Sequence, residues 1–291
     1  MVQDGYVSHK SMFSTAQYGS VRTTSDPRNI DYLERARSER SVDLTMVLDD
    51  WTPPSSAIGR SLKGIIFDLD GTLLSTLPLI IHCFNEVYSR YLDKTLSPEK
   101  IIASFGPTAR DLIRIQGRNL SKDQLQRAVD DYYECYRENA SSKVLIFPGI
   151  PELLEKLHRS GRRLAVVTGV ERVLMEYTLT KFGLSGMFEA MVGGDDVRNP
   201  KPDPEGVKLA LERMGLTSRE SIFIGDSPAD ILAGKAAKVL TAAALWSPEG
   251  KADPTEAGPD YKFRSVQELS TFLMPSEKKE EPGFYFAKDL G

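Results

Sequence analysis

The stretch that most constrains the fold is a short apolar run that ends in two carboxylates. The run Ile65–Phe67 is followed at once by the sequence Asp-Leu-Asp-Gly at 68–71. An uninterrupted apolar run of this length is typical of a parallel strand that is buried on both faces. Ligands of open α/β sheets collect at the carboxyl ends of such strands. We therefore predict an α/β fold with Asp68 and Asp70 at the ligand-binding edge of its sheet.

Two carboxylates separated by one residue can share a divalent cation while each keeps its own chemical role. Asp68 could attack phosphorus as a nucleophile, and Asp70 could protonate the leaving oxygen and later deprotonate the attacking water. Gly71 would let the backbone turn so that the main-chain carbonyl of Asp70 faces the cation. Because short motifs also arise by chance, an ordinary acidic turn is the alternative for this motif alone.

Two further segments carry groups that suit a phosphate. Residues 163–167 (Arg-Leu-Ala-Val-Val) show another buried-strand pattern and run into Thr168 and Gly169. A hydroxyl and free backbone N–H groups at a strand end could bind phosphate oxygens. In the segment 199–204, Lys201 stands between two prolines. The prolines reduce the backbone freedom that is lost when the ammonium is aimed at one point, although a solvated loop lysine is the alternative.

A second acidic cluster follows a third strand pattern. The apolar stretch 221–224 runs into Gly-Asp-Ser-Pro-Ala-Asp, which contains Asp226 and Asp230. In this order the motifs resemble those of the haloacid dehalogenase superfamily of phosphotransferases. That family carries an Asp-x-Asp-Gly-Thr, a strand-ending Thr or Ser, a loop Lys and a Gly-Asp-x-x-x-Asp, and each of these is present here. The resemblance covers about residues 63–270.

The resemblance implies a role for each motif residue. Asp68 would be the nucleophile and Asp70 the general acid and base. Thr168, Gly169 and Lys201 would bind the phosphate. A phosphoryl group in transit spreads negative charge over its oxygens, so fixed positive charge and hydrogen-bond donors at these positions would stabilise it.

The resemblance also implies a magnesium site. Its ligands would be Asp68, the main-chain carbonyl of Asp70, and Asp226, with Asp230 as a supporting carboxylate in the second shell. Carboxylates are hard oxygen ligands that suit magnesium rather than zinc. The chain has 3 histidines, and none lies near a motif, so we do not expect a metal site built from imidazoles.

The fold implied by the resemblance is a Rossmann-like three-layer α/β core with a mainly parallel sheet. We assign this core to residues 61–74 and 148–274. The insertion 75–147 is far too long for a strand-to-helix connection of about 2–6 residues. Its apolar residues recur at intervals of three and four within 79–92 and 125–136, which predicts helices. An inserted helical bundle is similar to the α-helical cap of the first cap class in this superfamily.

Selectivity is expected to come from the cap, because the core motifs contact only the phosphate. A Gly-Pro break at 106–107 is followed by a helix start that includes Thr108 and Arg110. The Arg110 guanidinium could bind a substrate carboxylate. A solvated basic helix face is the alternative.

We predict a magnesium-dependent phosphomonoester hydrolase that acts through an aspartyl-phosphate on a small phosphorylated metabolite, with a phosphoglycolate-like compound favoured. Sugar phosphates, nucleotides and pyrophosphate stay open as substrates. Asp70 disfavours a dehalogenase, because a halide leaving group needs no proton. A catalytically weak binding or regulatory module is the alternative of another class. Its signature would be a lost motif residue, and none is missing.

Composition limits the partners. The formal net charge is −4, and no basic stripe appears, so we do not expect nucleic acid as a partner. No apolar run approaches the roughly 18 residues of a membrane span, so we expect no membrane partner. Cys83 and Cys135 follow no disulfide-rich pattern, which favours reduced thiols in a cytoplasmic protein. The oligomeric state is not determined by these observations.

The two ends of the chain fall outside the motifs. Residues 1–60 are rich in Ser, Thr, Arg and Asp, and we expect an extension that is partly disordered or packed on the core. A Ser-rich start leaves organelle targeting open, although Asp4 and the sparse arginines weaken it. Residues 275–291 form a tail that begins with a charged run.

Overall fold

The computed structural model describes residues 61–248 and 252–274, all of them within the unit Val47–Gly291. The predictions for the extension 1–60 and for the tail 275–291 lie outside the described residues.

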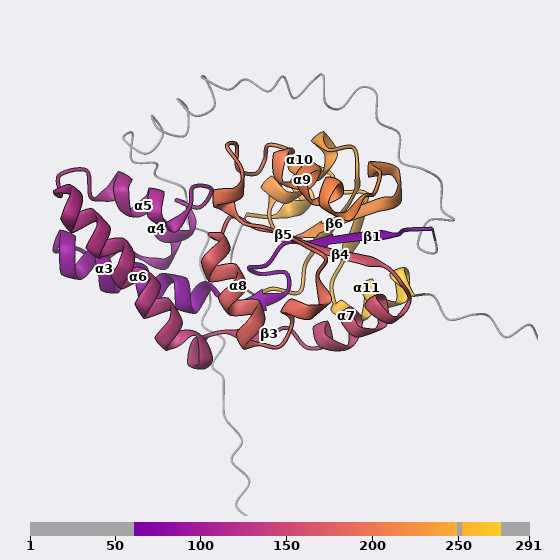
Figure 1. Ribbon diagram of the computed structural model, residues 1–291, viewed down its shortest axis with the longest axis horizontal. Helices are drawn as coiled ribbons and strands as arrows, with labels where there is room; N and C mark the ends of the chain where they lie inside the picture. The colour runs from indigo at the N-terminus through magenta and orange to yellow at the C-terminus, as the bar shows by residue number, and fades with distance from the viewer. Residues whose placement is uncertain (1–60, 249–251, 275–291) are drawn as a thin grey trace, which may run out of the picture. The chain divides into compact units, whose positions relative to one another are not determined.

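A six-stranded sheet, in which every neighbouring pair of strands is parallel, forms the centre of the described part of the chain (Figure 1). The strand order is β5-β4-β1-β6-β7-β8. The bounds are β1 Gly64–Phe67, β4 Arg163–Val167, β5 Ala190–Val192, β6 Ser221–Gly225, β7 Leu240–Ala244 and β8 Tyr261–Phe263. The register places Phe67 beside Val166 and Ile224, so the segments that follow β1, β4 and β6 leave the sheet at the same edge.

Helices cover both faces of this sheet (Figure 1). On one face lie α7 (Ile150–Arg159), α8 (Arg172–Lys181) and α11 (Val266–Leu273), and on the other lie α9 (Glu205–Met214) and α10 (Pro228–Ala236). In β1, Ile65 and Phe67 belong to the first hydrophobic core and Ile66 to the second, and all three are 0% exposed. Successive residues of a strand point to opposite faces, so a strand between two helix layers must be apolar throughout. The predicted three-layer α/β core with a mainly parallel sheet is confirmed.

Four helices lie between the short strands β2 (Leu74–Ser75) and β3 (Leu145–Ile146), which pair antiparallel. They are α3 (Leu77–Leu92), α4 (Pro98–Ile102), α5 (Ala109–Gln116) and α6 (Lys122–Lys143), and we call them the cap. The longest, α6, begins with a capping box in which the Ser121 and Gln124 side chains satisfy each other's backbone N–H groups. The rings of Phe84 in α3 and Tyr132 in α6 lie 4.8 Å apart, because the apolar positions of both helices face each other. The cap helices occupy the stretch for which the sequence predicts a helical insertion.

The two cysteines differ from the sequence expectation. Cys83 in α3 and Cys135 in α6 are joined by a disulfide, with their Cα atoms 5.7 Å apart. The prediction of reduced thiols is wrong, because it took no account of the two helix faces that pack together and bring the sulfurs into contact. Disulfide-bonded cysteines give no support to a cytoplasmic location, which stays a prediction. Within 61–248 and 252–274, the structure has no helix with the length and apolar character needed to cross a membrane.

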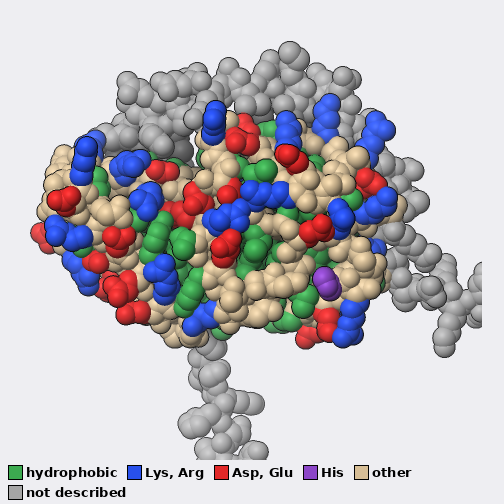
Figure 2. Space-filling view, viewed as in Figure 1, with side chains coloured by type: hydrophobic (Ala, Val, Ile, Leu, Met, Phe, Trp, Pro, Cys, Tyr) green, Lys and Arg blue, Asp and Glu red, His purple; other side chains and the backbone are tan. Residues whose placement is uncertain are grey.

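On the face drawn in Figure 2, Lys and Arg side chains lie among Asp and Glu side chains. The expectation that nucleic acid is not a partner stays a prediction, as does the expectation of no membrane partner.

We expect the Cys83–Cys135 disulfide to raise the free energy of unfolding by about 2–4 kcal/mol, because it restricts the unfolded chain. The two cysteines are separated by 52 positions, so the loop that they close is long. Urea unfolding of the full chain with and without reductant measures the effect. In the control variant Cys83→Ser/Cys135→Ser, reductant should leave the midpoint unchanged. Equal midpoints for the wild type under both conditions would contradict the prediction.

Candidate active site

Three aspartates from two segments of the chain converge at the carboxyl-terminal edge of the sheet. Asp68 follows β1, Asp226 follows β6, and Asp230 lies in the first turn of α10. One carboxylate oxygen of each lies within 4.8 Å of the other two, and the three residues are 4%, 5% and 1% exposed, respectively. A compact set of hard oxygen donors fits a divalent cation such as magnesium.

Backbone geometry brings these aspartates together. The Asp68 N–H donates to the Ile224 carbonyl over 2.9 Å, which keeps the ends of β1 and β6 level. A Cβ atom at Gly225 would lie 2.3 Å from the Cβ of Asp230, so only glycine lets α10 approach the strand this closely. The Ser227 hydroxyl donates to Asp230 Oδ2 over 2.6 Å and accepts from the Asp230 N–H. The same cap that starts α10 therefore orients the Asp230 carboxylate.

Lys201 links two of the three acids. Its ammonium donates to Asp68 Oδ1 over 2.7 Å and to Asp230 Oδ1 over 2.6 Å, and its side chain is 14% exposed. Burial lowers the pKa of Lys201, but the carboxylates of Asp230 and Asp68 outweigh that effect, so the pKa is raised above its ordinary value. The lysine is therefore a fixed positive charge beside Asp68.

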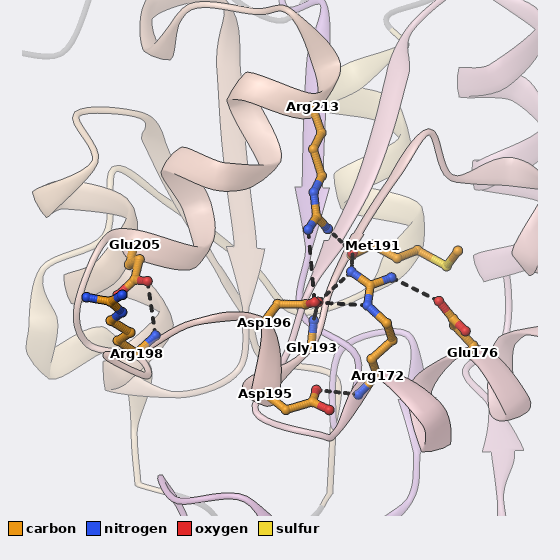
Figure 3. A network of polar contacts seen from close by, with 9 residues as sticks. All are labelled: Arg172, Glu176, Met191, Gly193, Asp195, Asp196, Arg198, Glu205 and Arg213. Carbon is orange, nitrogen blue, oxygen red and sulfur yellow. Dashed lines mark hydrogen bonds and ion pairs between the residues drawn. The ribbon is translucent and has the colours of Figure 1, made fainter.

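A polar network holds the loop that carries Lys201 (Figure 3). In that loop, the Asp196 carboxylate accepts two hydrogen bonds from the Arg172 guanidinium at the start of α8. The donor–acceptor distances are 2.5 Å from Arg172 Nη2 and 2.9 Å from Arg172 Nε. Further along, Glu205 at the start of α9 accepts the backbone N–H of Arg198 over 3.0 Å. Both ends of the loop are thus tied to neighbouring helices, which reduces the freedom of the segment that positions the ammonium.

Asp70 lies next to the hinge that leads into the cap. Gly71 has a φ of 85°, which gives the sharp turn expected from the sequence. The Thr76 hydroxyl donates to Asp70 Oδ1 over 2.7 Å, and Thr76 is the N-terminal cap residue of α3 and is 0% exposed. Thr76 was not among the site residues predicted from the sequence. Its signal was a threonine directly before Leu-Pro at a helix start.

Thr168 and Gly169 directly follow β4 and line the cavity described below. The Thr168 N–H donates to the Val192 carbonyl over 3.0 Å, and its hydroxyl accepts from the Val170 N–H over 3.3 Å. The two residues lie at the same edge of the sheet as the aspartates. Their role in binding phosphate stays a prediction.

A cavity of about 430 Å³ lies above these residues, between the sheet edge and the cap. Its floor includes Asp68, Asp70, Thr168, Gly169 and Lys201. Its other walls are mainly apolar and come from both cap and core. The cap contributes Ile80, Phe84, Ile102, Phe105, Leu112, Tyr132 and Tyr136 among others. The sequence pattern placed several of these residues on helices but did not assign them to a site.

The structure does not bring the side chains of Arg110 and Thr108 to this cavity, because neither residue is part of its described lining. The Thr108 hydroxyl caps α5 and accepts from the Asp111 N–H over 3.3 Å. The Arg110 guanidinium lies over the ring of Tyr133, 6.0 Å from its centroid. The guanidinium that was predicted to bind a substrate carboxylate thus lies outside the described lining, and other residues that line the cavity are candidates for selectivity.

One of them is Glu171, which the sequence analysis missed. It is 3% exposed, precedes the first residue of α8 and lines the cavity. Its Oε1 accepts the backbone N–H of Arg110 over 2.8 Å, which joins the core to the cap. A signal was available, because Glu171 lies three positions after Thr168 at a strand end.

Comparisons with known proteins show which family and fold this chain shares. A family model of haloacid dehalogenase-like hydrolases matches residues 65–244. A pyrophosphatase PpaX of Bacillus pumilus is 34% identical over 211 residues, which cover 72% of this chain and 95% of that protein. The crystal structure of a predicted phosphoglycolate phosphatase from Haemophilus somnus has a TM-score of 0.65 at 26% identity and covers 72% of this chain and 96% of that one.

The fold alone is shared with CbbY from Rhodobacter sphaeroides, whose crystal structure is a complex with phosphate. The TM-score is 0.62 at 24% identity, with 72% of this chain and 96% of that one covered. The family match spans more than half of the chain and contains every motif described above. The chain therefore belongs to the haloacid dehalogenase-like hydrolase family.

Proposed function

We propose that this protein is a magnesium-dependent phosphomonoester hydrolase that acts through an aspartyl-phosphate intermediate on a small phosphorylated metabolite. The observation that carries the proposal is the Asp68 carboxylate, which contacts the Lys201 ammonium and lies with Asp226 and Asp230 beneath a cavity. The names of the relatives support the same reaction class, since one is a pyrophosphatase and another a predicted phosphoglycolate phosphatase.

Charge is the main requirement of the reaction, because the phosphoryl group carries negative charge on its oxygens throughout. Asp68, Asp226 and the main-chain carbonyl of Asp70 would hold magnesium, which supplies positive charge at the phosphate when bound. Lys201 supplies a second, permanent positive charge. Thr168 and the backbone N–H groups around Gly169 would orient the remaining phosphate oxygens.

The chemistry then needs only two groups of the chain. A carboxylate oxygen of Asp68 forms a bond to phosphorus while the bond between phosphorus and the ester oxygen breaks, and Asp70 gives its proton to the leaving oxygen. Water next attacks phosphorus, Asp70 takes one of its protons, and the bond between Asp68 and phosphorus breaks. The net reaction of the two steps converts a phosphate ester and water into an alcohol and phosphate, and both aspartates return to their starting states. The hydrogen bond from Thr76 would hold Asp70 in place between these steps.

The substrate is less determined than the reaction. The preference for phosphoglycolate rested partly on Arg110 as a partner for a carboxylate, and that side chain lies over Tyr133 instead. Sugar phosphates, nucleotides and pyrophosphate stay open. The alternative of a catalytically weak binding module gains no support, because every motif residue is present and the three acids and the lysine lie together.

Replacing the nucleophile tests the proposal. We expect Asp68→Asn to lower the magnesium-dependent release of phosphate from para-nitrophenyl phosphate by a factor on the order of 10³ or more, because an amide cannot form the covalent intermediate. The matched control is Asp123→Asn, which makes the same change at an exposed position of α6 and should retain the wild-type rate. Removal of magnesium with a chelator should abolish release, and adding it back should restore it. Equal rates for Asp68→Asn and the wild type would refute the mechanism.

Lys201 provides a second test. We expect Lys201→Met to lower kcat/KM by about 10²-fold, because a fixed charge beside the transferring phosphoryl group is lost. Lys208→Met, at an exposed position of α9, is the control and should behave like the wild type. Circular dichroism of both variants checks that they are folded, since the change leaves Asp68 and Asp230 without their cation. A folded Lys201→Met variant with an unchanged kcat/KM would contradict the role.

A further inference from the structure

The half of the cavity that lies away from the aspartates has an unusual charge pattern for a site that binds phosphorylated metabolites. Among the described residues of its lining, Lys201 is the only Lys, Arg or His, and its ammonium already contacts Asp68 and Asp230. The single charged residue on the remaining wall is the acid Glu171. A second anionic group on a substrate would find no cationic side chain there.

Glu171 is held by neutral donors in the described part of the chain. It is 3% exposed, its Oε1 accepts the backbone N–H of Arg110 over 2.8 Å, and its carboxylate is hydrogen-bonded to the Tyr133 side chain. Within the described part of the chain, no nitrogen of a Lys, Arg or His side chain lies within 4.0 Å of its carboxylate. A buried carboxylate is costly unless it is hydrogen-bonded and paired with a positive charge. A positively charged group on a ligand would provide that pairing.

The surrounding wall suits an apolar group that ends in a cation. Phe84, Phe105, Tyr132 and Tyr136 all line the cavity. Aromatic rings attract cations through their faces and bury apolar groups through their area. Burial raises the pKa of Tyr132 and Tyr136, so both phenols stay neutral and add no negative charge of their own.

We propose that the cap half of the cavity binds a leaving group with an apolar body and a positively charged amine that faces Glu171, so that the substrate is the phosphate monoester of an amino alcohol. This inference rests on the proposed phosphatase activity and names the substrate class of the same site. It disfavours phosphoglycolate and pyrophosphate, because their second anion would face Glu171 without a cation to offset the repulsion. The cavity volume of about 430 Å³ is within the range of small-molecule sites.

A set of three matched aryl esters tests the inference on the full-length protein with magnesium. They are para-(aminomethyl)phenyl, para-ethylphenyl and para-(carboxymethyl)phenyl phosphate, which share one ring and differ mainly in charge. We expect kcat/KM to be highest for the amine and lowest for the carboxylate, with about tenfold between successive esters.

The role of Glu171 is tested by Glu171→Gln, whose amide oxygen can still accept the Arg110 N–H. The ratio of kcat/KM for the amine ester to that for the ethyl ester should fall about tenfold, toward one. The control Glu212→Gln removes the same charge at an exposed position of α9 and should leave that ratio as in the wild type.

The outcomes separate the two proposals. A preference of the wild type for the carboxylate ester, or an unchanged ratio in Glu171→Gln, would overturn the inference while the phosphatase activity stands. Failure of the wild type to release phosphate from any of the three esters would overturn the proposed function and this inference with it.

Discussion

Mutual repulsion among the buried carboxylates at one edge of the sheet governs how the candidate site is built. Asp68, Asp226 and Asp230 approach to within 4.8 Å and are almost fully buried. Like charges in a poorly solvated site are costly unless positive charge offsets them. The Lys201 ammonium contacts two of them, and a divalent cation would complete the balance. The same balance leaves positive charge where a phosphate would bind.

That balance is assembled from distant parts of the chain. Lys201 is 133 positions from Asp68 and 29 from Asp230. The parallel register of β1 and β6 places two of the acids, and the bonds that tie the loop to α8 and α9 place the lysine. The site is therefore a product of the sheet edge as a whole, which is consistent with the burial of the central strand on both faces. The cap has a different task, since its aromatic and aliphatic side chains form apolar walls above the charged floor.

The core of the fold and the core of the candidate site were predictable because both follow from local patterns. A continuous apolar run such as Ile65–Phe67 is typical of a strand between two layers, and the ends of parallel strands meet at one edge. Spacings of three and four likewise predicted the cap helices. Thr76 and Glu171 were missed, because their local signals mark a helix start and a strand end but do not show that one contacts Asp70 and the other lines the cavity.

Local sequence patterns were enough to predict the order of the motifs, the strand that each one follows, and the helical nature of the insertion, because these features depend on periodicity and on backbone preferences of neighbouring residues. Packing of the elements was needed to bring Cys83 to Cys135, to place the Arg110 side chain over Tyr133, and to put the Glu171 carboxylate in a mainly apolar wall. Each of these depends on which helix faces pack together. That choice is made by the complementary shapes of side chains far apart in the sequence, and no local pattern encodes it.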